Sequence, residues 1–409
     1  MPLRLRLQPS RGGLGFHVRF LKDITMRFDL ATSRRDVPPV VALLSVLALM
    51  TLWLASQPAW GTTEIQGTVV DSQGQTLAGL EVRVFGPRGD NAGGRAELAR
   101  TTSDEQGQFR LETPPGIGEL LELQGPAGTG RLRITERPLP LEITYPVPTT
   151  VVLLHDNDLH FDFNHQEAFG AVVQDIRDRY EHVFLVNAGD IFIRHSRQWP
   201  EPTQEFYAQA SRQIIEAMNR FGYDVLTLGN HEMDYQEDAT LQALSAAEFP
   251  LLVANVDITT ELLPPVAPYT VLRTDNDLTI AVLGLGRAVE KEGVRAHDPI
   301  RTAEQYVHLA DEHDIFVALT HIGFRTDQQL AEAVGVLDVI IGGHSHTMLE
   351  EAVLVNGVLI AQTRGTSGPA TPDRPKYLGK VILTLENDRI LDKQGQVFTL
   401  TAESPIPTR

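Results

Sequence analysis

The sequence predicts an α/β layered fold from about residue 150 onward, preceded by a small β-rich domain. Beyond residue 150, short apolar runs typical of buried strands alternate with stretches typical of helices. Between residues 62 and 147, shorter alternating runs are separated by turn signals rich in Gly and Gln. A length of 409 residues suits two folded domains and a targeting segment. We therefore predict an N-terminal extension over 1–61, a β-sandwich over 62–147 and an α/β domain over 148–409.

The charge of the chain limits its partners. The formal net charge is -18, although the first 37 residues hold eight Lys or Arg against three Asp or Glu. A nucleic-acid polymer would be repelled by so acidic a protein, whereas a small phosphate ester could still bind if metal cations supplied local positive charge. The chain has no cysteine, which excludes disulfides, thiolate zinc sites and a cysteine nucleophile.

An apolar run over 40–54 has the layout of a signal peptide. Arg34 and Arg35 precede it, and the small-residue pattern Ala59-Trp60-Gly61 follows it. We expect cleavage near Gly61 and export to the periplasm or the exterior. The alternative is an uncleaved membrane anchor over 38–58, the one case in which we expect contact with the membrane.

The export route and the start site stay open. Arg34-Arg35 behind Ser33 resembles a twin-arginine signal, but Asp36 and Val37 depart from its usual continuation, so the general secretory route is the alternative. Residues 1–25 show no hydrophobic period and precede Met26, a second possible start.

The segment over 62–147 reads as an antiparallel β-sandwich. Apolar residues fall at alternate positions, as expected where one face of each strand packs on a core: Val69, Leu80, Val82, Val84, Phe109 and Leu111. The stretches GTVVDSQGQTLAGLEVRVFG and TTSDEQGQFRLETPPG resemble carboxypeptidase-regulatory-like modules. This resemblance implies a scaffold or a binding module whose partner is unknown. Prolines over 138–148 predict an extended linker into the next domain.

In the α/β domain, polar residues follow the predicted strands. We expect strands over 149–155, 182–187, 224–229, 315–321 and 337–343, with helices over 167–180 and 203–221. Ligands of such sheets sit beyond the carboxyl ends of the strands. The residues at those ends are Asp158, His160, Asp190, Asn230, His231, His321, His344 and His346. We expect their five loops to be consecutive and to share one sheet edge.

These residue types are suited to a metal centre. Carboxylate, imidazole and carboxamide donors without thiolate fit Zn, Mn, Fe or Mg-type divalent ions. A carboxylate shared by two ions would hold them about 3.5 to 4 Å apart. Each motif alone has a common structural explanation, and Gly342 and Gly343 could serve only a tight turn. Their occurrence in order, each after an apolar run, predicts a metal site.

The motifs LLHDNDLH, NAGD, GYDVLTLGNHEMDY, THIG and IGGHSH together resemble the calcineurin-like metallophosphoesterase superfamily, in its 5′-nucleotidase branch. The resemblance covers about residues 150–386, and KYLGKVILTL resembles the strand that closes the family's catalytic domain. It implies an αββα four-layer sandwich that binds two divalent metal ions.

The resemblance also implies a role for each residue. Asp158, His160 and His346 would hold the first metal, Asn230, His321 and His344 the second, and Asp190 would bridge both. His231 would stand over the phosphoryl group, with Asp234 orienting its imidazole. Such a centre would activate water, neutralise the phosphate oxygens and protonate the departing oxygen through His231.

The sequence is consistent with three functions. The first is an exported phosphomonoesterase similar to 5′-nucleotidases, acting on nucleotides in nucleotide catabolism. The alternative is a phosphodiesterase or cyclic-nucleotide hydrolase, because the same centre handles diesters. The third is a non-catalytic cell-envelope binding protein. The sequence departs from the branch in the loop IFIRHSRQW after Asp190. Because it ends at Arg409, we expect it to lack the second domain that normally contacts the base in this branch.

Four further residues have simpler readings. His155 is expected to be a buried structural histidine, with support of a metal ligand as the alternative. His165 and His195 are expected to be solvated loop histidines that could face the cleft. Glu232 is expected to start a helix or play a structural role.

Overall fold

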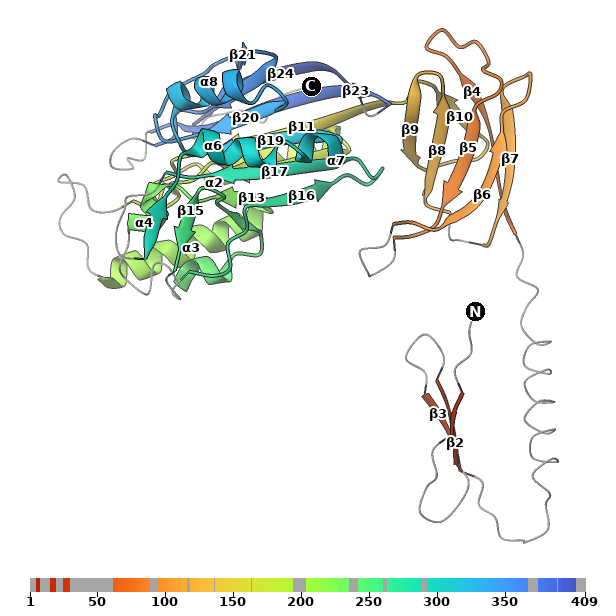
Figure 1. The fold of residues 1–409 in the computed structure, drawn as a ribbon, viewed down its shortest axis with the longest axis horizontal. Coiled ribbons are helices and arrows are strands. Elements are labelled where there is room, and N and C mark those ends of the chain that lie inside the picture. Colours follow the sequence, from red (N-terminus) through yellow and green to blue (C-terminus); the bar gives the residue numbers. More distant parts are fainter. Residues whose placement is uncertain are drawn as a thin grey trace. The chain divides into compact units, whose positions relative to one another are not determined.

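The structure, a computed structural model, divides into two compact units over 1–61 and 62–409. In the second unit it describes residues 62–401, with gaps at 89–93, 116–117, 136, 163, 194–203, 235–241, 260–262, 288–292, 367–373 and 388. In the first unit it describes the backbone of β1 (Leu5–Leu7), β2 (Gly15–Arg19) and β3 (Thr25–Asp29) (Figure 1).

The strands β1, β2 and β3 pair as one antiparallel sheet. These strands were not predicted, because this stretch of the sequence shows no regular alternation of apolar and polar residues. The predicted signal peptide or anchor over 38–58 and the cleavage position near Gly61 lie outside the described residues. Within the part of the chain that is described, no helix is long and apolar enough to cross a membrane.

Residues 63–144 form two packed sheets, in the orders β10-β4-β7 and β6-β5-β8-β9. Their strands are β4 (Thr63–Val70), β5 (Glu81–Phe85), β6 (Glu97–Thr102), β7 (Gln108–Thr113), β8 (Leu120–Gly125), β9 (Gly128–Arg133) and β10 (Leu141–Thr144). The six predicted core residues are buried between the sheets. Most pairs are antiparallel as predicted, but β10 runs parallel to β4 because the chain leaves β9 in one sheet and enters the other.

The α/β part contains two six-stranded sheets. The first has the order β14-β13-β12-β11-β23-β24, and the second has the order β16-β17-β19-β20-β22-β21. The first is built from β11 (Pro148–Asp156), β12 (His182–Asn187), β13 (Val225–Thr227), β14 (Leu251–Leu252), β23 (Lys376–Glu386) and β24 (Arg389–Leu400). The second is built from β16 (Tyr269–Arg273), β17 (Thr279–Leu285), β19 (Ile315–Thr320), β20 (Val339–Gly342), β21 (Val353–Val355) and β22 (Val358–Gln362).

The remaining elements connect or cover these sheets. The helices are α2 (Gln166–Arg179), α3 (Gln204–Phe221), α4 (Asn230–Asp234), α6 (Pro299–Ala303), α7 (Leu309–Glu312) and α8 (Phe324–Ala333). The described residues also include two 3-10 turns, η1 (Leu244–Ala246) and η2 (Glu304–Tyr306), and a separate pair of strands, β15 (Val256–Ile258) and β18 (Val294–Ala296). The predicted helices over 167–180 and 203–221 are α2 and α3 within one residue at each end.

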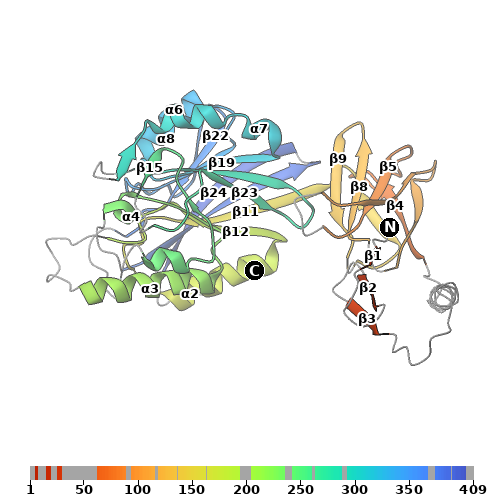
Figure 2. The same cartoon turned by 60° about the horizontal axis from the view of Figure 1, so that its bottom comes forward.

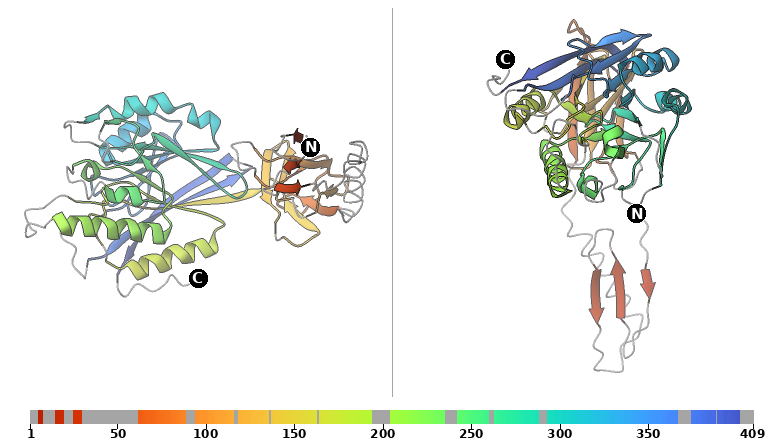
Figure 3. Two further views of the ribbon diagram at one scale, coloured as in Figure 1. Left: turned by 90° about the horizontal axis from the view of Figure 1, so that it is seen from below. Right: turned by 90° about the vertical axis from the view of Figure 1, so that its left-hand side faces the viewer.

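Alternation along the strands produces four layers. Val151 and Leu153 of β11 pack between the two sheets, whereas Val152 and Leu154 face α2 and α3. In the second sheet, Val317 faces the first sheet and the neighbouring residues face α7 and α8. The helices α2 and α3 cover one face and α6, α7 and α8 the other (Figures 2 and 3). The αββα fold predicted through the family resemblance is confirmed.

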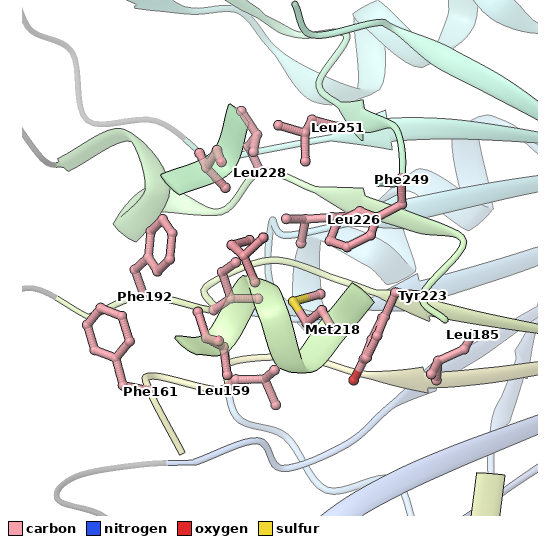
Figure 4. Close-up of a cluster of buried hydrophobic side chains, with 14 of the residues drawn as sticks. Leu159, Phe161, Leu185, Phe192, Met218, Tyr223, Leu226, Leu228, Phe249 and Leu251 are labelled. Carbon is pink, nitrogen blue, oxygen red and sulfur yellow. The ribbon is translucent and has the colours of Figure 1, made fainter. Parts of the chain in front are cut away.

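The outer core of the first sheet also supports the loops that follow its strands. Leu159 and Phe161 after β11, and Phe192 after β12, lie in one cluster with Met218 of α3 (Figure 4). The rings of Phe161 and Phe192 are 5.5 Å apart. Because Asp158, His160 and Asp190 are interleaved with these apolar residues, packing on α3 anchors the polar loops to the core.

Candidate metal centre

The predicted site residues converge from both sheets. Asp158 and His160 follow β11, Asp190 follows β12, and Asn230 and His231 begin α4 after β13, all in the first sheet. His321 follows β19, and His344 and His346 follow β20, in the second sheet. The expectation of five consecutive loops on one sheet edge is therefore wrong. The loops fall into groups of three and two, which meet where the two sheets pack face to face.

Five of the seven predicted ligands have left-handed backbone conformations. The φ angles are 49° at Asp158, 50° at His160, 57° at Asp190, 74° at His344 and 51° at His346. The left-handed conformation costs free energy for residues other than glycine, so it persists at these positions only where the surrounding structure enforces it. Here it turns the chain sharply at each strand end, which directs several side chains towards one point.

Glycines beside these ligands are required for close approach. A Cβ atom on Gly229 would lie 2.2 Å from Oδ1 of Asp190, and one on Gly343 would lie 2.8 Å from Nδ1 of His321. Neither glycine has a positive φ angle. A tight turn was one explanation for Gly343 from the sequence, and the structure adds that a side chain there would crowd both the carbonyl oxygen of Ala188 and the ring of His321.

The donor atoms form overlapping groups. Among the described residues, three sets place one donor atom from each member within 4.8 Å of the others: Asp158, His160 and His346; Asp190, His321 and His344; His160, Asp190 and His231. The first set is the predicted group for the first metal. The second set contains the predicted histidines of the second metal and the bridging Asp190, and Asn230 would add an amide oxygen to it. Oδ2 of Asp190 lies 3.5 Å from Nε2 of His160 and 3.0 Å from Nε2 of His321, so this carboxylate faces both groups.

Four donor atoms in this centre are buried without a hydrogen-bond partner among the described residues. They are Oδ1 of Asp158, Nε2 of His160, Oδ1 of Asn230 and Nε2 of His321. A buried polar atom left unpaired costs roughly 1 to 3 kcal/mol. Their convergence on shared space, with nitrogen and oxygen donors only, fits divalent cations of the Zn, Mn, Fe or Mg type.

Backbone carbonyl groups fix the orientation of three histidines. Nδ1 of His160 lies 2.6 Å from the carbonyl oxygen of Thr366, and Nδ1 of His321 lies 2.6 Å from that of Ala188. Nδ1 of His346 lies 3.0 Å from the carbonyl oxygen of Arg364. A carbonyl oxygen only accepts, so each Nδ1 carries a proton and Nε2 is the ring nitrogen that faces the centre, where it can bind a metal ion when it carries no proton.

The electrostatics show how strongly the centre attracts positive charge. Burial disfavours a charged imidazole, yet the neighbouring Asp190 carboxylate raises the pKa of His321 to about 10. Burial would raise the pKa of Asp190, but His321 and His160 hold it well below the usual range. Burial, followed by the charge of His321, lowers the pKa of His344 to about 4. In the metal-free chain, a proton on His321 therefore takes the place of a cation.

Glu232 joins two of the site loops. Its buried carboxylate accepts hydrogen bonds from the backbone amides of Gly229 at 2.7 Å, Asp190 at 2.9 Å and Phe192 at 3.2 Å. Sequence reasoning gave Glu232 only a general structural role. A carboxylate two residues after Asn230 on a short helix carries no signal of where its oxygens bond, so this specific role could not be predicted.

His231 lies beside Asp190 and belongs to the third of these donor sets. Its Nε2 is 3.9 Å from Oδ2 of Asp190, its side chain is 24% exposed, and its backbone amide donates to Oδ1 of Asp190 at 2.8 Å. The imidazole is therefore partly accessible to solvent, as is that of His346, whose side chain is 28% exposed. The side chain of Asp234, the predicted partner of His231, lies outside the described residues.

Of the other histidines named from the sequence, His155 and His165 are described, and neither belongs to a donor group. His155 is 1% exposed, and burial lowers its pKa to about 3, so it is a neutral core residue packed against Gly379. His165 precedes α2, where its Nε2 lies 2.8 Å from the carbonyl oxygen of Arg374. His195 lies outside the described residues.

The αββα fold and this cluster of aspartate, asparagine and histidine donors define a class, the two-sheet metallophosphoesterases. Residues 151–348 match the family model for calcineurin-like phosphoesterases. This family uses divalent metal ions, consistent with the His and Asp groups of the centre.

Individual relatives support the same placement. The chain is 26% identical over 296 residues to the trifunctional nucleotide phosphoesterase protein YfkN of Bacillus subtilis, covering 61% of this chain and 18% of that protein. It is 28% identical over 235 residues to the 5′-nucleotidase of Bos taurus, covering 49% and 39%. The 5′-nucleotidase precursor of Thermus thermophilus has the same fold, with a TM-score of 0.51, 24% identity and coverage of 62% and 55%. The chain thus spans about half or less of the length of these relatives.

Proposed function

We propose that this chain is a metal-dependent phosphoric ester hydrolase with a dinuclear centre. The observation that carries the proposal is the set of buried donor atoms without hydrogen-bond partners among the described residues, gathered around one carboxylate. Asp158, His160 and His346 would hold one ion, and Asn230, His321 and His344 the other. Asp190 would contact both, because its Oδ2 faces histidines of each group.

We assign different catalytic roles to the metal ions and to the residues around them. Divalent ions, when bound, would supply Lewis acidity for water and positive charge for the phosphate oxygens. The ring of His231 is partly exposed beside the donor groups, with its Nε2 3.9 Å from Oδ2 of Asp190, and we propose that it meets the substrate there. We assign it protonation of the departing oxygen, with Asp234 as the orienting partner. The strained loops keep the donors preorganised.

For the substrate we propose a nucleoside 5′-monophosphate or a related small phosphate monoester. The relatives named as nucleotide phosphoesterase and 5′-nucleotidase support this class. The acidic chain, with a net charge of -18, argues against a nucleic-acid polymer because the phosphate backbone would be repelled. Nucleotide catabolism is the corresponding cellular role.

Phosphate release from a substrate panel tests the assignment. The metal-reconstituted chain is assayed with nucleoside 5′-monophosphates, sugar phosphates, 3′,5′-cyclic nucleotides and bis-p-nitrophenyl phosphate, beside the variant Asp190→Ala. We expect the highest kcat/KM for nucleoside monophosphates, lost in the variant. Preference for cyclic nucleotides or the diester would replace the proposal with the phosphodiesterase alternative. No hydrolysis of any ester by a metal-loaded sample would favour a binding protein of the cell envelope.

We also propose export and a three-part organisation over 1–61, 62–147 and 148–409. The apolar run over 40–54 behind Arg34 and Arg35 supports export, and the separate core of the β-sandwich supports the second boundary. N-terminal sequencing of the protein from cell fractions tests this. A start near Thr62 in the exported fraction supports cleavage, an intact N-terminus in the membrane supports an anchor, and a cytoplasmic protein contradicts export.

A further inference from the structure

The segment Thr363–Thr366, directly after β22, lies against the first donor group. It is beyond the family match, which ends at residue 348. Its carbonyl groups at Arg364 and Thr366 accept from the Nδ1 atoms of His346 and His160, at 3.0 Å and 2.6 Å. Two of the three residues of one donor group therefore take their ring orientation from these four residues.

Asn157 ties the segment to the third member of the group. Its Oδ1 accepts from the backbone amide of Thr363 at 3.0 Å and from the Thr363 hydroxyl at 2.6 Å. Its Nδ2 donates to the Thr363 carbonyl at 3.1 Å and to Oδ2 of Asp158 at 2.6 Å. The amide of Thr366 donates to the carbonyl oxygen of Asp158 at 2.8 Å. Asp158, Asn157 and Thr363 are all fully buried, so these contacts are shielded from water.

Gly365 allows this close approach. Its φ angle is +60°, and a Cβ atom there would lie 2.6 Å from Cβ of Asp158 and 2.7 Å from the carbonyl oxygen of Asn157. Real Cβ atoms do not come so near, so any other residue would push the segment away from the Asp158 loop. A separation of 206 residues between Asn157 and Thr363 hides this relationship from the sequence.

Among the described residues, no hydrogen bond joins the segment directly to His321 or His344 of the second donor group. Nδ1 of His321 is held by the carbonyl oxygen of Ala188, in the loop after β12, at 2.6 Å. The backbone amide of His344 donates to Oδ2 of Asp158 at 3.0 Å. This bond joins the two donor groups directly, because Asp158 belongs to the first group and His344 to the second. The two groups therefore have separate backbone supports.

We propose that Thr363–Thr366 is a positioning element that sets the affinity of the first ion and leaves the second ion largely unaffected. The inference rests on the proposed dinuclear centre. By holding the Nδ1 protons of His160 and His346, the segment fixes both rings. Their Nε2 atoms then lie 3.9 Å and 3.5 Å from Oδ1 of Asp158. Loss of such outer hydrogen bonds typically weakens metal binding by about 10- to 100-fold.

Calorimetric titration of the chelator-stripped full chain with Mn²⁺ tests the proposal. Wild type is expected to bind two ions. Gly365→Ala is expected to keep one ion at wild-type affinity and to weaken the other by about 10- to 100-fold. Gly357→Ala is the matched control, because Gly357 also has a positive φ of +82° but nothing within 4 Å of its added Cβ. This control is expected to bind both ions as wild type does.

The outcomes separate the two claims. If wild type binds two ions and Gly365→Ala binds both with unchanged affinity, or weakens both equally, the positioning role is overturned while the dinuclear centre stands. If wild type binds no Mn²⁺, the proposed function fails first. Should Gly365→Ala not fold, Thr363→Val removes only the hydroxyl contacts, and a smaller loss confined to one ion is expected. Nitrogen NMR of the metal-free wild type must also show protonated Nδ1 atoms on His160 and His346.

Discussion

The imidazole Nε2 of His321 lies 3.0 Å from Oδ2 of Asp190, and both side chains are buried. The two residues come from different sheets, so this contact joins the halves of the α/β domain at the centre itself. Without metal, the pair is an imidazolium facing a carboxylate, because Asp190 raises the pKa of His321 against the effect of burial. A metal ion would have to displace that proton to bind Nε2.

Asp190→Asn keeps the shape of the side chain and removes its charge. We expect loss of both ions at micromolar metal concentration and at least about a 1000-fold fall in kcat/KM, because several kcal/mol of charge stabilisation would be lost. Metal content and phosphate release, measured on the same sample, test this. Retention of two ions would show that Asp190 does not connect the groups.

His231→Asn should separate acid catalysis from metal binding. A positioned general acid typically contributes about 10²- to 10⁴-fold, so kcat on a nucleoside monophosphate should fall by that factor. The fall should be much smaller on p-nitrophenyl phosphate, whose leaving group needs no proton, and metal content should not change. Loss of one ion would instead make His231 a ligand, which its grouping with His160 and Asp190 permits.

Glu232→Gln should destabilise the fold around the centre. The carboxylate accepts three backbone N–H groups, and a carboxamide would turn a donor group towards at least one of them. We expect a loss of about 1 to 3 kcal/mol in the free energy of unfolding of the metal-free protein, measured in urea. Glu332→Gln, on the exposed side of α8, should change it little. Equal effects of the two substitutions would contradict the role of Glu232.

Asp327→Asn should change how stability depends on pH. Burial raises the pKa of Asp327 from 3.8 to about 7, opposed by the hydroxyl of Thr320 at 2.6 Å. The folded chain thus holds a proton that the unfolded chain releases, so this group lowers stability as pH rises between about 4 and 7. The Asp327→Asn variant cannot release a proton at this position, so this fall in stability with rising pH is absent from it. Metal-free unfolding at pH 5 and pH 8 should therefore favour the variant more at pH 8, and an equal difference at both values would contradict the assignment.

Sequence patterns predicted the residues that converge in the centre, because each follows an apolar strand. The bounds predicted for β12, 182–187, agree with the structure, and Asp190 follows that strand. The strand order was not predictable in the same way, because β11 lies beside β23, more than 200 residues away. Local periodicity carries no information on such pairing, and for this reason the division of the loops between two sheets was missed.

Contacts made by the backbone also escaped prediction. Every residue has a carbonyl group, so nothing marks those of Ala188, Arg364 and Thr366 as the ones that orient histidines. Asn157 stands next to Asp158, yet its bonds to Thr363 depend on a segment brought near by folding. Residue types chosen for metal chemistry can be recognised from sequence, whereas their supports depend on the tertiary structure.

The central claim is that the converging Asp, Asn and His donors form a dinuclear hydrolytic centre. The most direct measurement is metal content by mass spectrometry together with phosphate release from nucleoside monophosphates, before chelation, after chelation and after adding Mn²⁺ or Zn²⁺ back. We predict two ions per chain, loss of activity when they are removed, and recovery in proportion to the ions rebound. Full activity in a chain stripped of metal would contradict the account.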